Sequence, residues 1–191
     1  MKPKVLIIYH SRHGSVAAMA NKIAIGAQSA GAEVFVRTVS SAGDAATNEH
    51  PAHPVVSKDE LLAAQAIITG CPVRFGQMSS QLKQFWEQTS DLWLQGALID
   101  KIGGVFTASA SLHGGQEANL LGMMLPMLHH GMLIAGQPYD APELLQTKTG
   151  GTPYGPSHVS GAQQSTVLTP EEQRLCLTYG KRLAMLAAKL L

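Results

Sequence analysis

The sequence predicts an α/β fold in which helices cover both faces of a parallel sheet, a doubly wound arrangement. Short runs of apolar and β-branched residues alternate with longer segments of helical periodicity along the whole chain. This alternation is typical of strands that are joined by helical crossovers. A hydrophobic content of 45% with 14% charged residues also indicates a globular chain with a sizeable core.

The predicted strands are short apolar runs bounded by turn residues, and each is joined to the next by a crossover that contains a helix. Five such strands give a five-stranded parallel sheet. They span residues 4–10, 32–39, 66–70, 102–110 and 132–136.

The predicted helices are recognised by their periodicity and their end signals. Gly31 and Gly131 are expected to end two of them, Pro126 to kink the fourth, and Thr169 to cap the last, with Pro170 in its first turn. The helices are predicted at residues 15–31, 59–64, 79–93, 117–131 and 169–191.

Two connections are longer than a crossover needs. Residues 40–58 are small, polar and rich in Pro, which predicts a surface connection. Residues 136–168 are too many for a plain link between a helix and a strand, and they contain the turn-forming run TGGTPYGP. We expect this second segment to be an ordered lid or a subunit contact.

Composition excludes several classes of protein. The 191 residues suit one domain, residues 1–191, and a net charge of +1 without basic runs argues against nucleic-acid binding. No segment reaches the length of a membrane span, so a cytoplasmic protein is expected. Cys71 and Cys176 form neither a CxxC pair nor a disulfide framework and are expected to be reduced, and the eight His residues show no spacing for a metal site.

Three unusual turns follow the first, third and fourth predicted strands: HSRHGS at 10–15, CPVRFGQMS at 71–79 and SASLHGGQE at 109–117. In doubly wound sheets of flavodoxin-like order, ligands bind beyond the carboxyl ends of the strands. The three Gly-containing turns are therefore expected to form one site there.

The first turn connects a strand directly to a helix, where unpaired N–H groups and the helix dipole favour an anion. The Walker and dinucleotide glycine spacings are both missing, so a single terminal phosphate fits best. Ser11 and Ser15 supply hydroxyls. The alternative is that Ser15 simply caps the helix.

The second turn places Arg74 and Phe75 on a loop after a buried strand, which a flat ring system with hydrogen-bonding edges would explain. Alternatively, Phe75 packs beneath the loop and Arg74 is a solvated charge. In the third turn, small residues and Gly114 let the backbone approach a ring closely. Here the alternative is a flexible connection in which Glu117 stabilises the start of the next helix.

His130, at the end of the fourth predicted helix, is a candidate to hydrogen-bond a substrate carbonyl, and the alternative is contact with the last carbonyls of its helix. Trp93 is expected near the same edge as an apolar wall of the site, although a Trp of the core or of an interface is the alternative.

Taken together, YHSRHGSVAAMA, GCPVRFGQMSSQLKQFW, LWLQGALIDKIGGVFTASASLHGGQE, LHHGM and GGTPYGPS resemble the WrbA family of FMN-dependent NAD(P)H:quinone oxidoreductases. The resemblance covers nearly the whole chain in register. It implies a flavodoxin-like fold, non-covalent FMN, NADH or NADPH as co-substrate, quinones as substrates, and a homotetramer with its flavin sites at subunit contacts.

The resemblance also implies the site residues. Arg74 and His130 would be catalytic, with His13, Trp93 and His130 beside nicotinamide and quinone. The residues implied to bind FMN are Ser11, Arg12, His13, Gly14, Ser15 and Val16 at the phosphate, Pro72, Val73, Arg74, Phe75 and Gly76 at the ring, and Ala108, Ser109, Ala110, Ser111, Leu112, His113, Gly114 and His130.

Three features depart from the family pattern. His13 stands where the family often has Tyr, at a position linked with the nicotinamide nucleotide. Val73 replaces a Thr, and the missing hydroxyl is expected to weaken FMN binding by about 1 kcal/mol. The connection at 40–58 is shorter than usual, which affects the channel rim or the tetramer contacts.

The resulting hypothesis is a ping-pong cycle in which NAD(P)H passes a hydride to the flavin and leaves, and a quinone then takes the hydride in the same space. Two readings compete with it. The first is a flavodoxin-type FMN electron carrier that is not reduced by NAD(P)H directly. The second is an oligomeric scaffold that holds FMN as a structural ligand.

Overall fold

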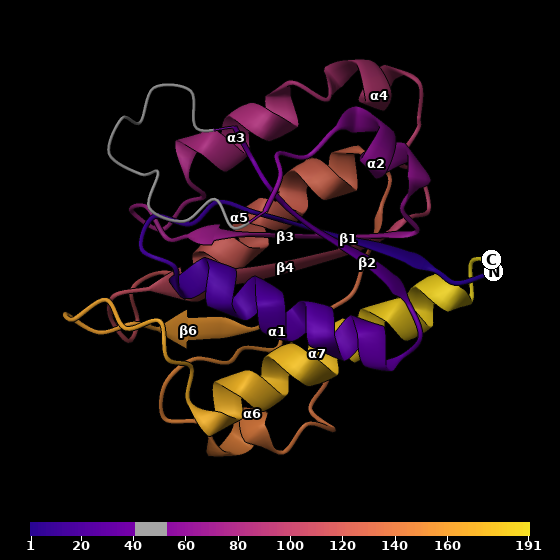
Figure 1. The fold of residues 1–191 in the computed structure, drawn as a ribbon. Helices are drawn as coiled ribbons and strands as arrows, with labels where there is room; N and C mark the ends of the chain where they lie inside the picture. Colours follow the sequence, from indigo (N-terminus) through magenta and orange to yellow (C-terminus); the bar gives the residue numbers. More distant parts are fainter. Residues whose placement is uncertain (41–52) are drawn as a thin grey trace.

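The computed structural model describes residues 1–40 and 53–191, in which a twisted parallel sheet lies between two layers of helices (Figure 1). The strand order is β2-β1-β3-β4-β5. The first four strands are β1 (Lys4–Tyr9), β2 (Glu33–Thr38), β3 (Ala66–Pro72) and β4 (Ile102–Ser109). This confirms the predicted α/β fold and the flavodoxin-like order of the strands.

The fifth position of the sheet is filled by two short strands instead of the continuous strand predicted at 132–136. β5 (Leu133–Ile134) pairs with the start of β4, and β6 (Ser157–Val159) pairs with its end. Both lie on the edge of β4 that faces away from β3, because β3 pairs with β4 along nearly its full length. The chain between them leaves the sheet and includes α6 (Glu143–Gln146).

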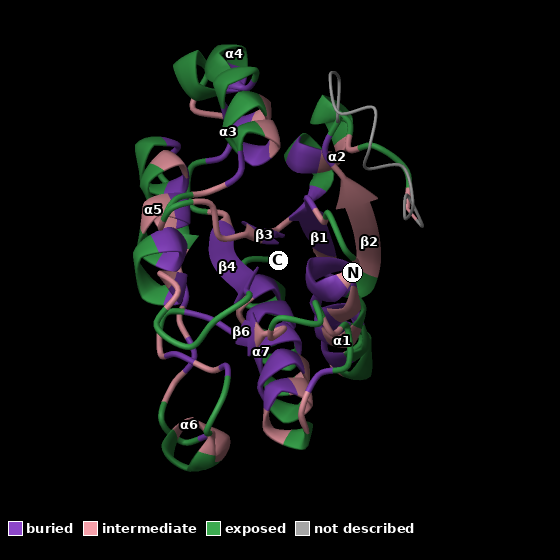
Figure 2. Ribbon diagram, turned by 90° about the vertical axis from the view of Figure 1, so that its left-hand side faces the viewer, coloured by how far each residue is buried: buried purple, intermediate pink, exposed green. Residues whose placement is uncertain are grey.

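Helices cover both faces of the sheet, and their buried sides face it (Figure 2). One apolar core lies beneath α1 and α7, and the other beneath α2, α3, α4 and α5. The bounds of these helices are α1 Ser15–Ser29, α2 Lys58–Ala63, α3 Ser80–Glu87, α4 Ser90–Leu94, α5 Gln116–His129 and α7 Pro170–Ala188.

α1 and α7 pack closely at two glycines. A Cβ atom on Gly26 would overlap the carbonyl oxygen of Leu177, and one on Gly180 would overlap that of Ile23. The missing side chains therefore let the two backbones touch where the second half of α1 crosses the middle of α7.

The helix predicted at 79–93 is in fact two helices, α3 and α4, separated at Gln88 and Thr89. The Thr89 hydroxyl donates to the carbonyl oxygen of Trp86 at 2.7 Å, and Thr89 leaves the helical conformation at φ −99° and ψ 13°. A threonine that bonds back to its own helix competes with the backbone ladder, and periodicity alone does not reveal this.

The two long connections differ in outcome. Of the predicted surface connection at 40–58, residues 41–52 lie outside the described residues. The segment at 136–168 is ordered, as predicted, but it also contains α6 and β6, which the sequence did not predict. Cys71 and Cys176 are buried free thiols, as expected.

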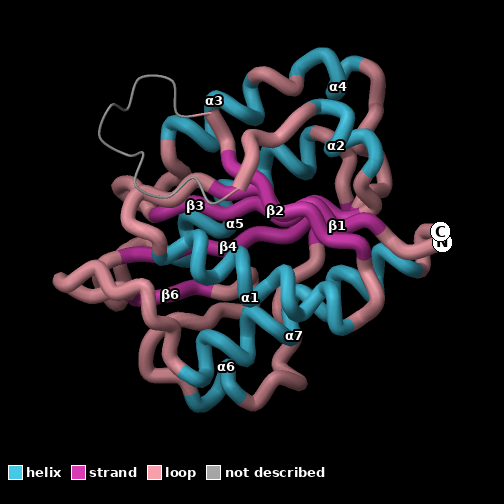
Figure 3. Tube along the Cα trace, in the orientation of Figure 1, coloured by secondary structure: helices cyan, strands magenta, loops and turns pink. Residues whose placement is uncertain are grey.

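Strands β1, β3, β4 and β6 end at one edge of the sheet, where the loops that follow them gather, whereas β5 pairs only with the start of β4 (Figure 3). Because the strands are parallel, every helix that follows a loop at this edge runs back toward the opposite edge. Among the described helices, none is long and apolar enough to cross a membrane.

Candidate active site

The three predicted loops meet at the carboxyl edge of the sheet around a cavity of about 160 Å³. Eleven predicted site residues line this cavity: Ser11, Arg12, His13, Ser15, Val16, Pro72, Val73, Arg74, Ala108, Ser109 and Ala110. Gly14, Phe75, Gly76, Ser111, Leu112, His113 and Gly114 belong to the same loops but do not line it.

The first loop ends at Gly14, the N-cap of α1, whose φ of 93° is a left-handed conformation that favours glycine. The Ser11 hydroxyl accepts from the N–H of Gly14 at 3.1 Å and from that of Ala17 at 3.4 Å. Within the described residues this leaves the first two helical N–H groups, those of Ser15 and Val16, without a protein acceptor. These groups and the helix dipole favour an anion at this position.

Ser15 is not a helix cap. Its hydroxyl donates to the carbonyl oxygen of Ser165 at 3.0 Å, and no side chain caps α1. The alternative considered for this residue from the sequence is therefore wrong. The hydroxyl instead joins the first loop to the segment between β6 and α7.

The second loop is a tight turn in which Arg74 and Gln77 exchange both backbone hydrogen bonds at 2.9 Å. Phe75 occupies its tip with a φ of 51°, and its side chain is fully exposed. Packing of Phe75 beneath the loop is therefore excluded. An exposed aromatic ring in a conformation that is rare for its type indicates a binding surface.

The third loop is ordered, which contradicts the alternative of a flexible connection. The Ser109 hydroxyl and the Gln116 amide both donate to the carbonyl oxygen of Ser111, at 2.7 and 2.9 Å. Gly115, at a φ of 95°, packs so closely that an added Cβ atom would lie 2.9 Å from the Cα atom of Gly76. The second and third loops therefore support each other.

A buried network of hydrogen bonds fixes the ends of β3 and β4, from which these two loops begin. The Thr107 hydroxyl donates to the carbonyl oxygen of Cys71 and accepts from the Asn119 amide, both at 2.7 Å. The N–H of Val73 donates to the carbonyl oxygen of Ala108 at 2.9 Å. Burial raises the pKa of the Cys71 thiol, which therefore stays protonated and serves as part of this support.

Sequence reasoning missed two residues that line the cavity, Ser160 and Gln164. Both follow β6, and the Ser160 N–H donates to the carbonyl oxygen of Ser109 at 2.8 Å. The unusual length of the 136–168 connection was the available signal. The strand that carries these residues to the site has only three residues, too few to show a pattern.

Trp93 and His130 do not lie at this cavity in one chain, contrary to the prediction. α5 begins beside the third loop, and its 14 residues, at about 1.5 Å each, carry the helix about 21 Å toward the opposite edge. The carbonyl oxygen of Gly131 there accepts from the N–H of Asp100, two residues before β4 begins. His130 therefore lies at the edge where α5 ends, and not at the loop edge where α5 starts.

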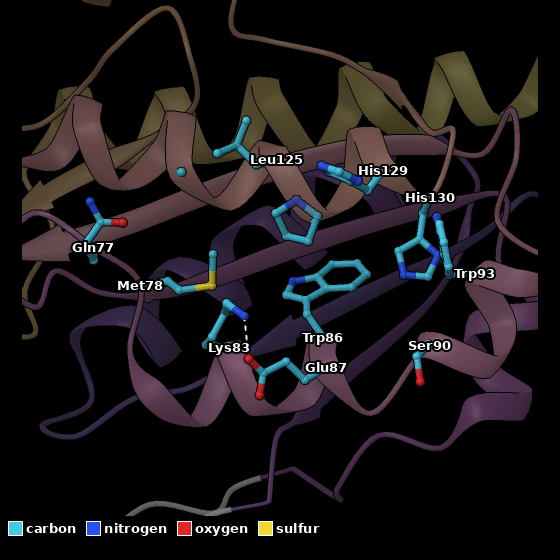
Figure 4. A pocket seen from close by; sticks show the side chains of 12 residues that line it. Gln77, Met78, Lys83, Trp86, Glu87, Ser90, Trp93, Leu125, His129 and His130 are labelled. Atoms are coloured by element: carbon cyan, nitrogen blue, oxygen red, sulfur yellow. Dashed lines mark hydrogen bonds and ion pairs between the residues drawn. The ribbon is translucent and has the colours of Figure 1, made fainter.

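Trp93 and His130 instead lie at one end of a groove of about 590 Å³ between α3 and α5, with Gln77 and Met78 at its other end (Figure 4). Trp86 lies along its floor, 5.5 Å from the His130 ring. The groove thus leads from the second loop to the far edge of the sheet. Apolar side chains, such as Trp86 and Leu125, make up most of its surface, although half of its lining residues are polar or charged, and Trp93 is about half exposed.

His130 is nearly buried, and its Nε2 lies 2.9 Å from the Thr89 hydroxyl oxygen. Because the hydroxyl proton of Thr89 is donated to Trp86, Nε2 of His130 carries the proton in this bond. Burial, together with the charge of His129, lowers the pKa of His130, so the neutral ring is favoured. Its Nδ1 is then an acceptor, and it has no partner among the described residues.

These features fit FMN at the three-loop cavity. Two unpaired N–H groups, the Ser11 hydroxyl and two guanidinium groups suit a phosphate, and neither Arg12 nor Arg74 has an ion-pair partner in residues 1–40 and 53–191. A cavity of about 160 Å³ is too small for a three-ring system. The ring would lie outside it, against the second and third loops. No cluster of three potential metal ligands occurs in the described part of the chain.

Comparison with known proteins supports FMN as the cofactor. A family model described as NADPH-dependent FMN reductase matches residues 3–141. Proteins named NAD(P)H dehydrogenase (quinone) from Gluconacetobacter diazotrophicus and Rhizobium johnstonii are 39% and 42% identical, each over 98% of both chains.

Among solved structures, a flavodoxin, WrbA-like protein from Agrobacterium tumefaciens superposes with a TM-score of 0.71 at 27% identity, over 98% of both chains. A flavodoxin from the domain Archaea, at 21% identity and a TM-score of 0.67, shares the fold over 97% of this chain. The chain therefore belongs to the NADPH-dependent FMN reductase family and, within it, to the WrbA-like NAD(P)H dehydrogenases (quinone).

Proposed function

We propose that this protein is an FMN-dependent NAD(P)H:quinone oxidoreductase that reduces quinones to hydroquinones by two electrons. The observation that carries the proposal is the cavity where the loops after β1, β3 and β4 meet, with unpaired N–H groups at the start of α1. Relatives named NAD(P)H dehydrogenase (quinone) match almost the whole chain at about 40% identity.

The chain binds and orients its cofactor with the three loops. The Ser11 hydroxyl and the N–H groups of Ser15 and Val16 hold the phosphate, and the turn at Arg74 and the 108–114 loop hold the ring. FMN, when bound, supplies the two-electron chemistry. The Arg74 guanidinium favours the electron-rich reduced form of the ring, and the exposed Phe75 side chain borders it.

NAD(P)H and quinone occupy the same space in turn, in a ping-pong order. Ring stacking against a fixed platform orients each substrate, and the loops exclude water from one side of it. His13, which is exposed on the first loop, contacts the nicotinamide nucleotide. The protein needs no nucleophile of its own for this chemistry.

A second subunit completes the site. One chain leaves the ring position open, whereas its α4 and α5 carry exposed apolar side chains, which mark a contact surface. These include Trp93, Leu94, Leu121, Leu125 and Leu128. In a homotetramer, the groove of a neighbour brings its Trp93 and His130 to the flavin that the other subunit holds.

The function is tested by a visible spectrum of the purified protein with added FMN, followed anaerobically by NADH or NADPH and then benzoquinone. Loss of the flavin band with the nucleotide and its return with quinone establish both half-reactions. A bound flavin that neither nucleotide bleaches refutes the oxidoreductase and favours the electron carrier. Failure to bind FMN refutes both.

A further inference from the structure

A buried acidic residue, Glu172, lies behind the FMN cavity in the first turn of α7. Its side chain is completely buried and accepts four hydrogen bonds. The N–H groups of Gly150 and Val159 donate to Oε1 at 2.9 and 3.2 Å, and the N–H of Thr169 and Nδ1 of His158 donate to Oε2, both at 2.8 Å. Four donors fix this group as a carboxylate.

The partner His158 is also buried, with 1% of its surface exposed, and both of its ring nitrogens face acceptors. Nδ1 faces the Glu172 carboxylate, and Nε2 lies 2.9 Å from the carbonyl oxygen of Ser165. Neither acceptor carries a proton, so both bonds form only when the ring is an imidazolium. Hydrogen bonds to Glu172 and Ser165 accordingly raise the pKa of His158.

The Ser165 carbonyl oxygen connects this pair to the proposed phosphate site. It accepts from His158 and also from the hydroxyl of Ser15, the first residue of α1. The N–H of Ser165 donates to the carbonyl oxygen of Ser160 at 2.8 Å, which closes a turn over residues 160–165. Ser160 and Gln164 of this turn line the cavity.

Stability alone is a poor reason for a buried ion pair, because apolar side chains of similar volume often serve as well. The pair instead fixes the one carbonyl group to which the Ser15 hydroxyl is bonded. We propose that His158 and Glu172 are positioning residues that hold the 160–165 turn against the first loop and so shape the FMN phosphate site. This inference rests on the proposed placement of the phosphate.

The charged groups that act on the pair are His158 and Glu172 themselves. The Glu172 charge also acts on the Cys176 thiol on α7, whose pKa is raised mainly by burial. The charge of Lys22 on α1 acts on the same thiol. The thiol stays neutral across the ordinary pH range. Among the described residues, His158 is therefore the group of this network whose charge changes as pH rises through its raised pKa.

The experiment measures dissociation constants of FMN and of riboflavin, which has the same ring without the phosphate, on the FMN-free protein. His158→Leu removes both donors and is expected to raise the FMN dissociation constant about tenfold or more, while that of riboflavin changes by less than about twofold. His158→Gln, whose amide reaches only one of the two partners, gives an intermediate loss. It also serves if the Leu variant does not fold.

Arg37→Gln is the matched control, because it breaks the partly buried Arg37–Glu60 pair on the opposite face of the sheet. It is expected to lower stability and to leave the FMN-to-riboflavin ratio unchanged. In the unaltered protein the preference for FMN, which is the riboflavin dissociation constant divided by that of FMN, is expected to fall as pH rises through the raised pKa of His158. In His158→Leu it stays flat.

An unchanged FMN preference in His158→Leu overturns the positioning role, as does an equal loss of both ligands, which marks a purely structural effect. If the unaltered protein already binds FMN no better than riboflavin, the placement of the phosphate is wrong, and the proposed site falls with the inference. The two failures are therefore distinguishable.

Discussion

The proposed division of the active site between subunits predicts that two inactive variants restore activity when they assemble together. The first variant, Gly14→Val, places a β-branched residue at a φ of 93° and is expected to lose FMN binding. The second, Trp93→Ala with His130→Ala, keeps the loops and loses the end of the α3–α5 groove. Each alone is expected to have little activity.

The expected recovery of activity follows from the distance that separates the three loops from the end of the α3–α5 groove in one chain. α5 places His130 about 21 Å from the loop edge of its own chain, too far for one side chain to reach a flavin there. In the proposed assembly, each site draws its loops from one subunit and its groove from another. Random mixing in equal amounts leaves about one quarter of the sites with both parts intact.

Co-expression of the two variants with different affinity tags and purification over both tags gives the mixed assemblies. NAD(P)H:quinone activity per protein is compared with each variant alone and with a mixture made after purification, in which subunits have not exchanged. Recovery near one quarter of the unaltered activity is expected. Activity equal to the sum of the separate variants would refute the shared site.

Three further predictions concern single positions. Glu172→Gln is expected to cost about 3 kcal/mol in urea unfolding, because the folded state lowers the pKa of Glu172 from 4.5 to about 2. The two partners contribute to the free energy of unfolding over different pH ranges. The contribution of Glu172 is present above pH 4.5 and is lost as pH falls toward 2. The contribution of His158 is present below pH 6.5 and is lost as pH rises through its raised pKa. The cost is thus largest between these limits, and a cost independent of pH would contradict it. Arg74→Ala is expected to weaken FMN binding or slow its reduction by NAD(P)H about tenfold, and unchanged titration and stopped-flow results would remove its assigned role. Gly180→Ala is expected to lower the melting temperature by several degrees, because its Cβ atom would overlap the carbonyl oxygen of Ile23, and an unchanged melting curve would contradict that packing.

The fold was predictable because each level of the sequence agreed with the next. Strands β1, β3 and β4 are continuous apolar runs, and the end of α1 near Gly31 and the cap of α7 at Thr169 have strong local signals. The loop site followed from topology alone, since parallel strands end at one edge. The break at Thr89 depends on one side-chain bond, and β6 depends on pairing with β4, so neither has a local pattern.

The misplaced pair, Trp93 and His130, shows a different kind of failure. Both residues end helices, and a helix that follows a parallel strand ends at the edge opposite to the loops. The family resemblance associates them with the flavin, whereas the geometry of one chain separates them from it. A second copy of the chain satisfies both requirements, and the exposed apolar side chains of α4 and α5 provide a surface for it.

The same geometry bears on the choice between an oxidoreductase and an electron carrier. A carrier needs one exposed flavin edge and a charged face for transient partners, while this chain has a net charge of +1 and an apolar surface beside its groove. An apolar contact that closes over the ring favours two-electron exchange with small substrates, because it excludes water and large partners alike. Assembly is therefore part of the catalytic argument: a monomeric variant that keeps FMN is expected to lose quinone reduction while it keeps its flavin spectrum.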